Sequence, residues 1–332
     1  MQALATVDNV RLVAQSPGLE PDEVRIAVTL PTFRRPEQVL ETIRSVAAQN
    51  TNRCYALIVM ENDAERHAGA DAAAPLFENG TVNGLVIVAE ERGNCSAYNA
   101  GWSTALAAFA NLSHVLVIDD DELAVPDWLE TMVATAERLG VDIVGGPQVP
   151  VFEESGNDHW ANHPVFAPPY RETRPVEALY SSGNLLVSRR VLDAMERPFL
   201  EPAFNFMGGG DSDFLSRAVR KGFRLAWCAE APVMETIPAR RLESDWIRAR
   251  SLRNGVISTL VEKRKRTGEP LGAARVAAKS LALLAAAPLR GLLSLARSGS
   301  LTVGAYPVYV ALGRVLAEFG YANEQYRQAE KN

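Results

Sequence analysis

The sequence has few cysteines and no N-terminal export signal. Cys54, Cys95 and Cys228 are its three cysteines, and no two of them form a CxxC pair, which argues against a zinc ribbon or a dithiol redox motif. Sparse cysteines in odd number are typical of a reducing compartment. The first residues, MQALATVDNVRLVAQSPG, lack the basic start and apolar run of a signal peptide. We therefore expect a cytoplasmic protein.

The chain also lacks an excess of positive charge and a long apolar run. Its net charge is -6 over 332 residues, so no basic field is present to attract nucleic acid, and we expect none as a partner. The longest apolar stretch near the end, Leu281 to Leu289, is far shorter than the roughly 20 residues that cross a bilayer. With 47% hydrophobic residues, the length suits one large globular domain with an appendage.

Short apolar runs alternate with helical patterns from residue 24 onward. This order predicts an α/β fold with a mostly parallel sheet. The expected strands are 24–30, 55–60, 85–89 and 114–118, with later ones at 183–188 and 223–227. The expected helices are 36–47, 96–109 and 126–139, with another after Asp211.

Three regions follow from the pattern: an N-terminal tail over 1–23, a main domain over 24–268 and a helical extension over 269–332. Residues 147–174 are rich in Pro, Asn, His and aromatic side chains, so we expect a long loop there. A further helical pattern covers 306–326.

Four consecutive carboxylates follow the apolar run His114 to Ile118. Ligands of open α/β sheets bind at the carboxyl ends of the strands, which is where Asp119 to Glu122 would lie. Adjacent acids repel one another unless a cation neutralises them, and oxygen ligands suit Mg²⁺ or Mn²⁺. The alternative is a solvated acidic turn.

This element makes the chain resemble the inverting family-2 glycosyltransferases, most closely the succinoglycan-type exopolysaccharide branch. Ile118 to Asp121 match the hDxD element of that family, and the likeness extends over about residues 24 to 260. It implies a GT-A fold, a Rossmann-like sheet flanked by helices. It also implies that Asp119 and Asp120 bind the nucleotide-sugar donor, with Asp119 near the ribose, and that Asp121 binds the metal.

The resemblance assigns further residues to the donor pocket. The run from Pro31 to Arg35 resembles the opening P-T-[FY]-x-R element beside the base, and Glu61 stands where the family more often has Asp. Tyr98 stands where the family more often has Arg. A capped helix start is the alternative for residues 91–101. The donor-binding residues implied in this way are Pro31, Thr32, Arg34, Glu61, Asp63, Arg92 and Asn94.

Gly208 to Phe214 resemble the family signature G-E-D-x-D-[FL], with Gly210 in place of the usual Glu. Inversion at an anomeric carbon requires one general base, and Asp211 is the candidate. A helix-capping role for Asp211 is the alternative. The resemblance also implies Glu235 as a second metal ligand. The acceptor-side residues implied are Gly183, Asn184, Gly210 and Asp213.

The helical extension combines Leu and Ala with Arg275, Lys279 and Arg290. Such a helix is typical of an interfacial segment on an anionic membrane surface. A helical hairpin packed on the main domain, or at a dimer interface, stays open as the alternative.

These features together predict an inverting, metal-dependent hexosyltransferase. We expect it to use a nucleotide diphosphate sugar, with UDP as the expected nucleotide. The acceptor would be a saccharide or lipid-linked oligosaccharide of surface polysaccharide or glycolipid synthesis. The alternative is a non-catalytic sugar-nucleotide-binding scaffold, which Gly210 and Tyr98 motivate. The enzyme is favoured because Asp119, Asp121, Asp211 and Glu235 occur together.

Overall fold

The computed structural model describes residues 7–321 and divides them between two compact units. Unit 1 comprises residues up to Val149, Pro169–Asn205 and Gly210–Glu235, and unit 2 comprises Pro150–Pro168, Phe206–Gly209 and the chain from Thr236. Residues 1–6 of the expected tail, 322–326 of the expected helix and the rest of the extension to 332 lie outside the described residues.

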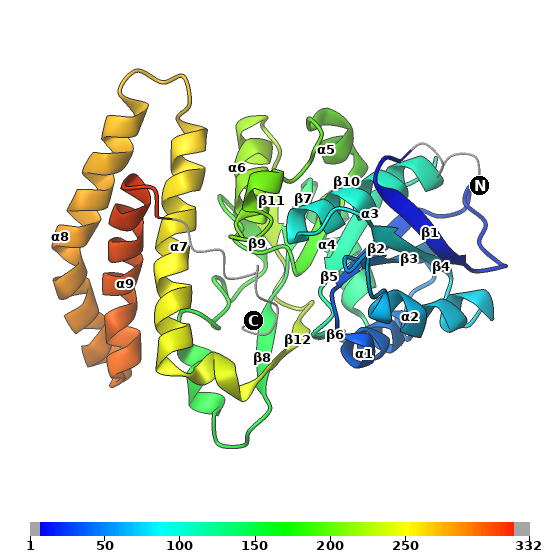
Figure 1. Cartoon of the computed structure of the whole chain (residues 1–332), viewed down its shortest axis with the longest axis horizontal. Helices are drawn as coiled ribbons and strands as arrows, with labels where there is room; N and C mark the ends of the chain where they lie inside the picture. Colours follow the sequence, from blue (N-terminus) through cyan, green and yellow to red (C-terminus); the bar gives the residue numbers. More distant parts are fainter. Residues whose placement is uncertain (1–6, 322–332) are drawn as a thin grey trace. The chain divides into compact units, whose positions relative to one another are not determined.

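Unit 1 is built on a nine-stranded sheet in the order β1-β4-β3-β2-β5-β10-β7-β11-β9 (Figure 1). Its middle is parallel: β2 pairs with both β3 and β5, and β3 pairs with β4. The strands that were expected there are all present. Their bounds are β2 Ile26–Thr32, β3 Tyr55–Glu61, β4 Gly84–Ala89 and β5 His114–Ile118.

The remainder of the sheet makes it mixed rather than mostly parallel. Strand β10 (Asn184–Ser188) runs antiparallel to both neighbours, β5 and β7 (Ile143–Gly145), and β11 (Leu225–Trp227) pairs in parallel with β7. Strand β9 (Arg174–Val176) closes that edge in the antiparallel sense. The reversal at β10 depends on where the chain re-enters the sheet, which a periodic apolar pattern does not encode.

The expected tail, 1–23, contains β1 (Val10–Gln15), which pairs antiparallel with β4 at the other edge of the sheet. The expected loop over 147–174 begins with β8 (Gln148–Phe152) and includes a short 3₁₀ helix, Asp158–Asn162. β8 belongs to a three-stranded sheet with β6 (Glu122–Ala124) and β12 (Val233–Ile237).

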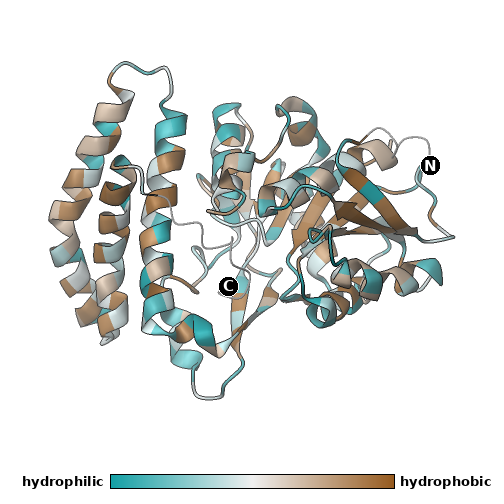
Figure 2. Cartoon of the chain, in the orientation of Figure 1, coloured by the Kyte–Doolittle hydropathy of each residue, from teal (hydrophilic) through white to brown (hydrophobic). Residues whose placement is uncertain are grey.

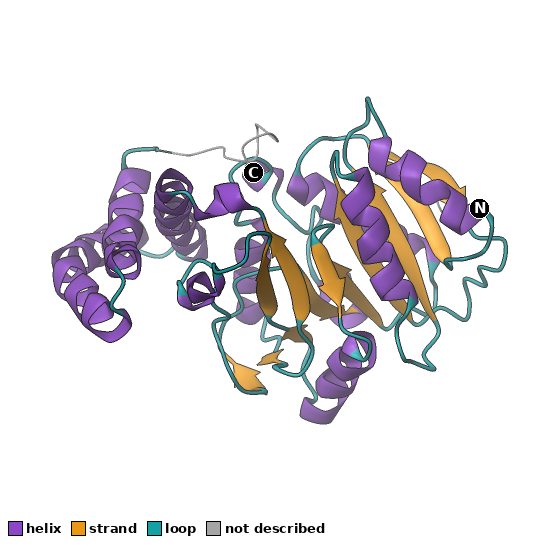
Figure 3. Cartoon of the chain, turned by 90° about the horizontal axis from the view of Figure 1, so that it is seen from below, coloured by secondary structure: helices purple, strands orange, loops and turns teal. Residues whose placement is uncertain are grey.

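Helices pack on the faces of the parallel strands because alternate strand residues point to opposite sides. Val28 and Leu30 lie in a core with apolar residues of α1 (Pro36–Ala47), α2 (Ala68–Glu78) and α4 (Trp128–Leu139). On the other side, Gly101 of α3 (Asn94–Ala108) lies directly against Met60. Helices α5 (Arg189–Ala194) and α6 (Gly210–Arg220) complete unit 1, and Figure 3 shows the helices against the strands.

Unit 2 contains three long helices, α7 (Ser244–Lys265), α8 (Gly272–Ser298) and α9 (Leu301–Glu318). Only two residues separate α8 from α9, so they form a hairpin, as Figure 1 shows. The unit includes α7, so the boundary expected at 268 falls inside it. The apolar run Leu281 to Leu289 forms the middle of α8. The run alone is too short to cross a membrane, but α8 as a whole is long and apolar enough by length and composition.

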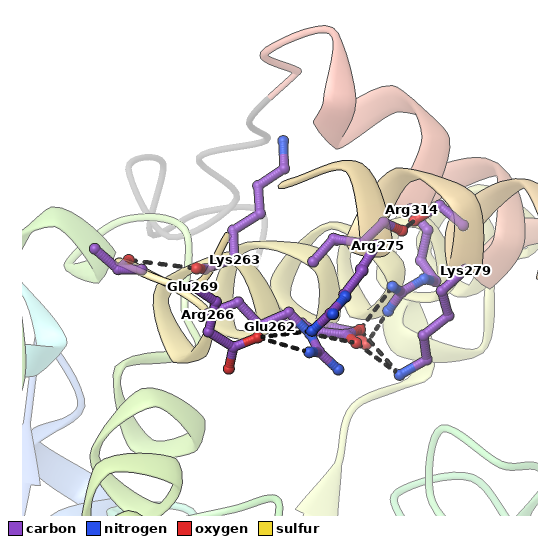
Figure 4. A network of polar contacts seen from close by, with 11 residues as sticks. Glu262, Lys263, Arg266, Glu269, Arg275, Lys279 and Arg314 are labelled. Atoms are coloured by element: carbon purple, nitrogen blue, oxygen red, sulfur yellow. Dashed lines mark hydrogen bonds and ion pairs between the residues drawn. The ribbon is translucent and has the colours of Figure 1, made fainter. Parts of the chain in front are cut away.

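A charged network joins the three helices of unit 2 (Figure 4). Glu262 of α7 accepts hydrogen bonds from Arg314 of α9 at 2.9 Å and from Lys279 of α8 at 3.0 Å. Arg314 is almost fully buried, and its guanidinium also donates to the Ser258 hydroxyl. Such pairs fix the helix register, since each buried charge needs its partner in place.

Two glycines bring α7 and α9 into close backbone contact. A Cβ on Gly255 would overlap the carbonyl oxygen of Val310, and a Cβ on Gly313 would overlap that of Leu252. We expect Gly255→Ala to lower the free energy of unfolding of unit 2 by about 1–3 kcal/mol, because the helices must separate to admit the methyl group.

Denaturant unfolding followed by circular dichroism measures this effect. Gly18→Ala is the matched control, because nothing lies within 4 Å of the added Cβ. Equal stability of the two variants would contradict the close packing of α7 and α9.

Candidate functional site

The acidic run lies where β5 leaves the sheet, at the edge formed by the carboxyl ends of the parallel strands. Ile118 ends β5, and Glu122 begins β6. Neighbouring β2 ends at Thr32, and antiparallel β10 begins with Asn184 opposite Ile118. The fold thus gathers the polar ends of β5 and β2 with the loop before β10.

Asp119 is held by a tyrosine from α3. The Tyr98 hydroxyl donates to Asp119 Oδ1 at 2.8 Å and accepts from Ser182 Oγ at 3.1 Å. Burial and the nearby charge of Asp121 raise the pKa of Asp119 to about 7, although the hydrogen bond from Tyr98 opposes the shift. Tyr98, which the resemblance marks as a departure from the family, is therefore a direct partner of the acidic run.

Asp120 and Asp121 share one arginine. Arg35 Nη1 donates to Asp120 Oδ1 at 2.8 Å and to Asp121 Oδ2 at 2.9 Å. Thr32 Oγ1 donates to Asp120 Oδ2 at 2.9 Å, so Thr32 is a direct partner of the acidic run. Burial raises the pKa of Asp120 to about 6 against the opposing charge of Arg35. Arg34 was expected in the site and Arg35 was not, because the sequence does not reveal which of two adjacent side chains turns toward the acids.

Glu122 and Glu235 occupy opposite positions on β6 and β12, so their side chains leave the same face of the small sheet. Glu122 is fully buried, and its carboxylate accepts from the Asp119 backbone N–H at 2.8 Å and from Gln148 Nε2. Burial, followed by the charges of Asp119 and Glu235, raises the pKa of Glu122 well above its usual value. From the sequence, Glu122 had no role beyond membership of the acidic run. In the structure it lies between Asp119 and Glu235 and so brings Glu235 into the acidic cluster.

Gly183 lies inside this cluster. A Cβ there would be 2.9 Å from Asp119 Oδ2 and 2.8 Å from Glu122 Oε1, so a side chain would displace the carboxylates. Asn184 was expected on the acceptor side, but it is 2% exposed. It donates to the carbonyls of Pro147 and Ala231 and accepts from Trp128 Nε1. The Asn184 side chain therefore has a structural role, because these partners satisfy the hydrogen-bonding groups of its buried amide.

The donor set of this cluster suits a hard divalent cation. Asp119, Asp121, Glu122 and Glu235 supply only carboxylate oxygens, and burial together with the charges of neighbouring acids raises the pKa values of Asp119 and Glu122. In residues 7–321 no three His, Cys, Asp or Glu side chains already converge as a metal site. Asp121 and Glu235 are the residues that would hold Mg²⁺ or Mn²⁺. They remain an assignment made from the sequence.

The other donor residues form a second cluster beside β3. Arg34 pairs with Asp63 at 2.6 Å, and the guanidinium groups of Arg34 and Arg92 lie 4.8 and 5.0 Å from the Phe33 ring centroid. Burial raises the pKa of Asp63, but hydrogen bonds from Arg34 and from backbone N–H groups outweigh it and hold that pKa below its ordinary value. Asp63 is therefore a charged acceptor.

Glu61 has a structural use that the sequence did not reveal. Its carboxylate accepts from the backbone N–H groups of Asp63, Gly69 and Ala70, which ties the end of β3 to the start of α2. These bonds occupy the carboxylate that was expected to accept from a base. The missed helix α2 explains the difference, since its first N–H groups need an acceptor.

The loop before α3 is fixed at both ends. Asn62 accepts from the Gly93 N–H at 2.7 Å and donates to the Glu91 carbonyl at 2.8 Å. Gly93 has φ of 135°, and any Cβ there would overlap the Asn205 side chain. The chain then enters α3 at Asn94, which is exposed. Pro31 lies within β2, opposite Met60 of β3.

Gly210 and Asp211 begin α6, near the same helix α3. A Cβ on Gly210 would overlap Cys95 Sγ, so this packing has no room for the family's usual Glu. Burial and the charges of Asp211 and Asp213 raise the pKa of Cys95 to about 12. Cys95 and Tyr98 are one helical turn apart, so α3 connects the start of α6 with the acidic cluster.

Asp213 was expected on the acceptor side. It is buried, and its carboxylate accepts from Arg217 Nε at 2.8 Å, one turn further along α6. Arg217 also donates to the Phe199 carbonyl. Asp213 therefore helps to fix the position of α6. Asp211, in contrast, is only partly buried.

A carboxylate-rich strand end beside a glycine-started helix places this chain among the α/β proteins that bind ligands at the carboxyl edge of their sheet. The chain belongs to glycosyl transferase family 2, whose model matches residues 27–195. It is therefore a glycosyltransferase, and the expected family is confirmed.

Known proteins support this assignment. The chain is 30% identical over 243 residues to the succinoglycan biosynthesis protein ExoM of Rhizobium meliloti, covering 70% of this chain and 74% of that protein. Among solved structures, the mannosyltransferase PcManGT from Pyrobaculum calidifontis in complex with GDP-Man and Mn²⁺ has a TM-score of 0.57 at 17% identity, covering 90% of each chain. S. aureus TarS 1–349 in complex with UDP has a TM-score of 0.51 at 13% identity, covering 90% of this chain and 91% of that one. These likenesses confirm the GT-A fold.

The raised pKa of Asp119 gives a prediction about stability. Between the ordinary carboxyl pKa and about 7, folded Asp119 holds a proton that the unfolded chain has lost, so its contribution to stability falls as pH rises. We expect metal-free Asp119→Asn to gain stability relative to the wild type as pH increases from 5 to 8.

Denaturant unfolding at several pH values measures this difference. Comparison with the wild type removes the contributions of His114 and His163, whose lowered pKa values change stability in the opposite direction. A difference between variant and wild type that does not change with pH would contradict the buried, mutually repelling cluster.

Proposed function

We propose that this glycosyltransferase is an inverting, metal-dependent hexosyltransferase that uses a UDP-sugar. The observation that carries the proposal is the cluster of Asp119, Asp121, Glu122 and Glu235, in which burial and neighbouring charges raise the pKa values of Asp119 and Glu122. A protein that bound no cation here would gain nothing from burying these acids together. A nucleotide diphosphate and a divalent cation would together satisfy the cluster.

Each of the following site residues has a defined role in this proposal. Asp63 accepts a hydrogen bond from the base, and Arg34 keeps it charged and oriented. Asp119, fixed by Tyr98, accepts from the ribose hydroxyls. Arg35 holds Asp120 and Asp121 in their positions. A cation held by Asp121 and Glu235 would supply positive charge for the diphosphate leaving group.

Asp211 is the proposed general base. Its Oδ1 accepts from the Ser212 N–H at 2.7 Å, which fixes the carboxylate at the first turn of α6. Neighbouring Gly210 has no side chain to screen it. Asp211 would take the proton of the acceptor hydroxyl as that oxygen bonds to the anomeric carbon, while the carbon–diphosphate bond breaks on the opposite face.

The acceptor is proposed to be a saccharide or lipid-linked oligosaccharide of surface polysaccharide or glycolipid synthesis. The support is the 30% identity to a succinoglycan biosynthesis protein. The proposed place of action is the cytoplasmic side of a membrane.

Donor binding is expected to require Asp121. Calorimetric titration of UDP and GDP into the wild type should show binding with Mn²⁺ and much weaker binding without it, because a cation held by Asp121 and Glu235 would neutralise the charge of the diphosphate. Asp121→Ala should abolish the metal-dependent part.

The matched control for this titration is Asp193→Asn, which changes an exposed acid on α5 that pairs only at the surface. UDP binding that is unaffected by Mn²⁺ or by Asp121→Ala would remove the metal assignment. Binding of GDP alone would change the donor base.

Catalysis is expected to depend on Asp211 without affecting donor binding. Asp211→Asn should reduce kcat by about 10²- to 10⁴-fold, because the amide cannot accept the acceptor proton. Its UDP affinity should match that of the wild type.

The measurement is transfer of radiolabelled sugar from the donor to a membrane or oligosaccharide extract, with Asp71→Asn of α2 as an exposed acidic control. Wild-type donor binding without any transfer or donor hydrolysis would instead support the scaffold. Full activity in Asp211→Asn would assign the base elsewhere.

A further inference from the structure

The outward face of α8 is apolar over residues 278–292. Leu281, Leu289 and Leu292 are 60%, 64% and 64% exposed. Together with Ala278 and Ala285, they recur every three or four residues from 278 to 292 and form one stripe, here called the α8 stripe. Figure 2 shows the apolar character of α8. Single exposed leucines are ordinary, but a continuous stripe of them marks a surface that binds something apolar.

The inner face of the same helix is used for packing. Val276, Ser280, Ala287 and Gly291 are buried. Gly291 approaches α9 so closely that a Cβ would be 2.7 Å from the Gly304 carbonyl oxygen. The packing of α8 on α9 therefore does not use the α8 stripe.

A row of cations runs beside the α8 stripe. Arg275, Lys279, Arg290 and Arg297 are separated by 4, 11 and 7 residues, which are close to whole helical turns, and α8 contains no Asp or Glu. Arg275 and Lys279 pair with Glu269 and Glu262, yet they stay 62% and 54% exposed (Figure 4). Arg290 and Arg297 form no ion pair within residues 7–321. This local positive charge contrasts with the net charge of -6 of the chain.

We propose that α8 lies flat on an anionic bilayer, with the α8 stripe among the acyl chains and the cation row at the lipid headgroups. An apolar face bordered by Lys and Arg is the pattern of helices that bind in the plane of a membrane surface. Each cation near an anionic surface strengthens binding, and salt weakens it. This inference goes beyond the transfer chemistry and does not depend on it.

Two other roles for α8 fit the contacts less well. If α8 crossed the bilayer, Lys279 and Arg290 would lie in the hydrocarbon. The inner face of α8 would then either lose its contact with α9 or bring Glu262 and Arg314 into the bilayer as well. If two copies paired through the α8 stripe, the cation rows would find no opposite charge on the facing helix, because α8 contains no Asp or Glu. An anionic surface satisfies the stripe and the cations together.

Vesicle flotation of the full-length chain tests the proposal. We compare vesicles of phosphatidylcholine alone with vesicles containing 30% phosphatidylglycerol, as a chosen composition, at low and high salt. The wild type should float with the anionic vesicles and be released by salt. Leu289→Asp with Leu292→Asp, and separately Arg290→Glu with Arg297→Glu, should each lower partitioning by at least about tenfold.

The controls are Val219→Asp on α6 and Arg44→Glu on α1, which make the same chemical changes at exposed positions outside α8. Unchanged circular dichroism of the α8 variants shows that the changes at exposed positions leave the fold intact. UDP titration of the same variants separates loss of docking from failure of the donor site.

Three outcomes would overturn the proposal. Equal binding to neutral vesicles would remove the role of the cations. Resistance to both salt and alkaline extraction would indicate a spanning helix. A chain that binds no vesicle, but whose dimer in light scattering is broken by Leu289→Asp with Leu292→Asp, would make the α8 stripe an interface between copies.

Discussion

Mutual repulsion among buried carboxylates is the constraint around which unit 1 is organised. Asp120 and Glu122 are buried and Asp119 is half-buried at one strand end, and Glu235 faces Glu122 from β12. Burying such charges is unfavourable unless partners supply hydrogen bonds or opposite charge. Each neighbouring element supplies one: Tyr98 from α3, Arg35 before α1 and Gln148 from β8. The acids therefore depend on hydrogen-bond partners from segments that are far apart in the sequence.

The two departures from the family pattern become understandable in these terms. Tyr98 replaces a cation with a neutral hydroxyl that donates to Asp119, so the cluster keeps more of its negative charge. Gly210 leaves the start of α6 without a second carboxylate, and Cys95 lies where a side chain would extend.

Much of the parallel core could be predicted from the sequence, because β2 to β5 are buried on both faces and read as continuous apolar runs. Strand β1 could not, since it is a partly exposed edge strand that depends on β4 for pairing. Helix α2 was missed because Pro75 in its interior reads as a helix breaker, although its Ala residues favour a helix. The reversal of β10 is a matter of topology and leaves no local signal.

Within the site, the sequence identified the acidic run but could not divide tasks inside it. Glu61 and Asn184 have the right chemistry for ligand contacts, yet the fold uses them to tie α2 and the strands together. Arg34 and Arg35 are the same residue type. They have different partners because the backbone at Arg34, with a φ of 57°, directs Arg35 elsewhere. These distinctions depend on three-dimensional contacts that residue type and spacing do not specify.

The central claim is that the end of β5 holds a divalent cation together with a nucleotide diphosphate sugar. Anomalous diffraction from crystals grown with Mn²⁺ and UDP tests it most directly. The account predicts one manganese peak in contact with Asp121 and Glu235, with the diphosphate bound to the same ion. A peak elsewhere, or a nucleotide bound away from this strand end, would contradict it.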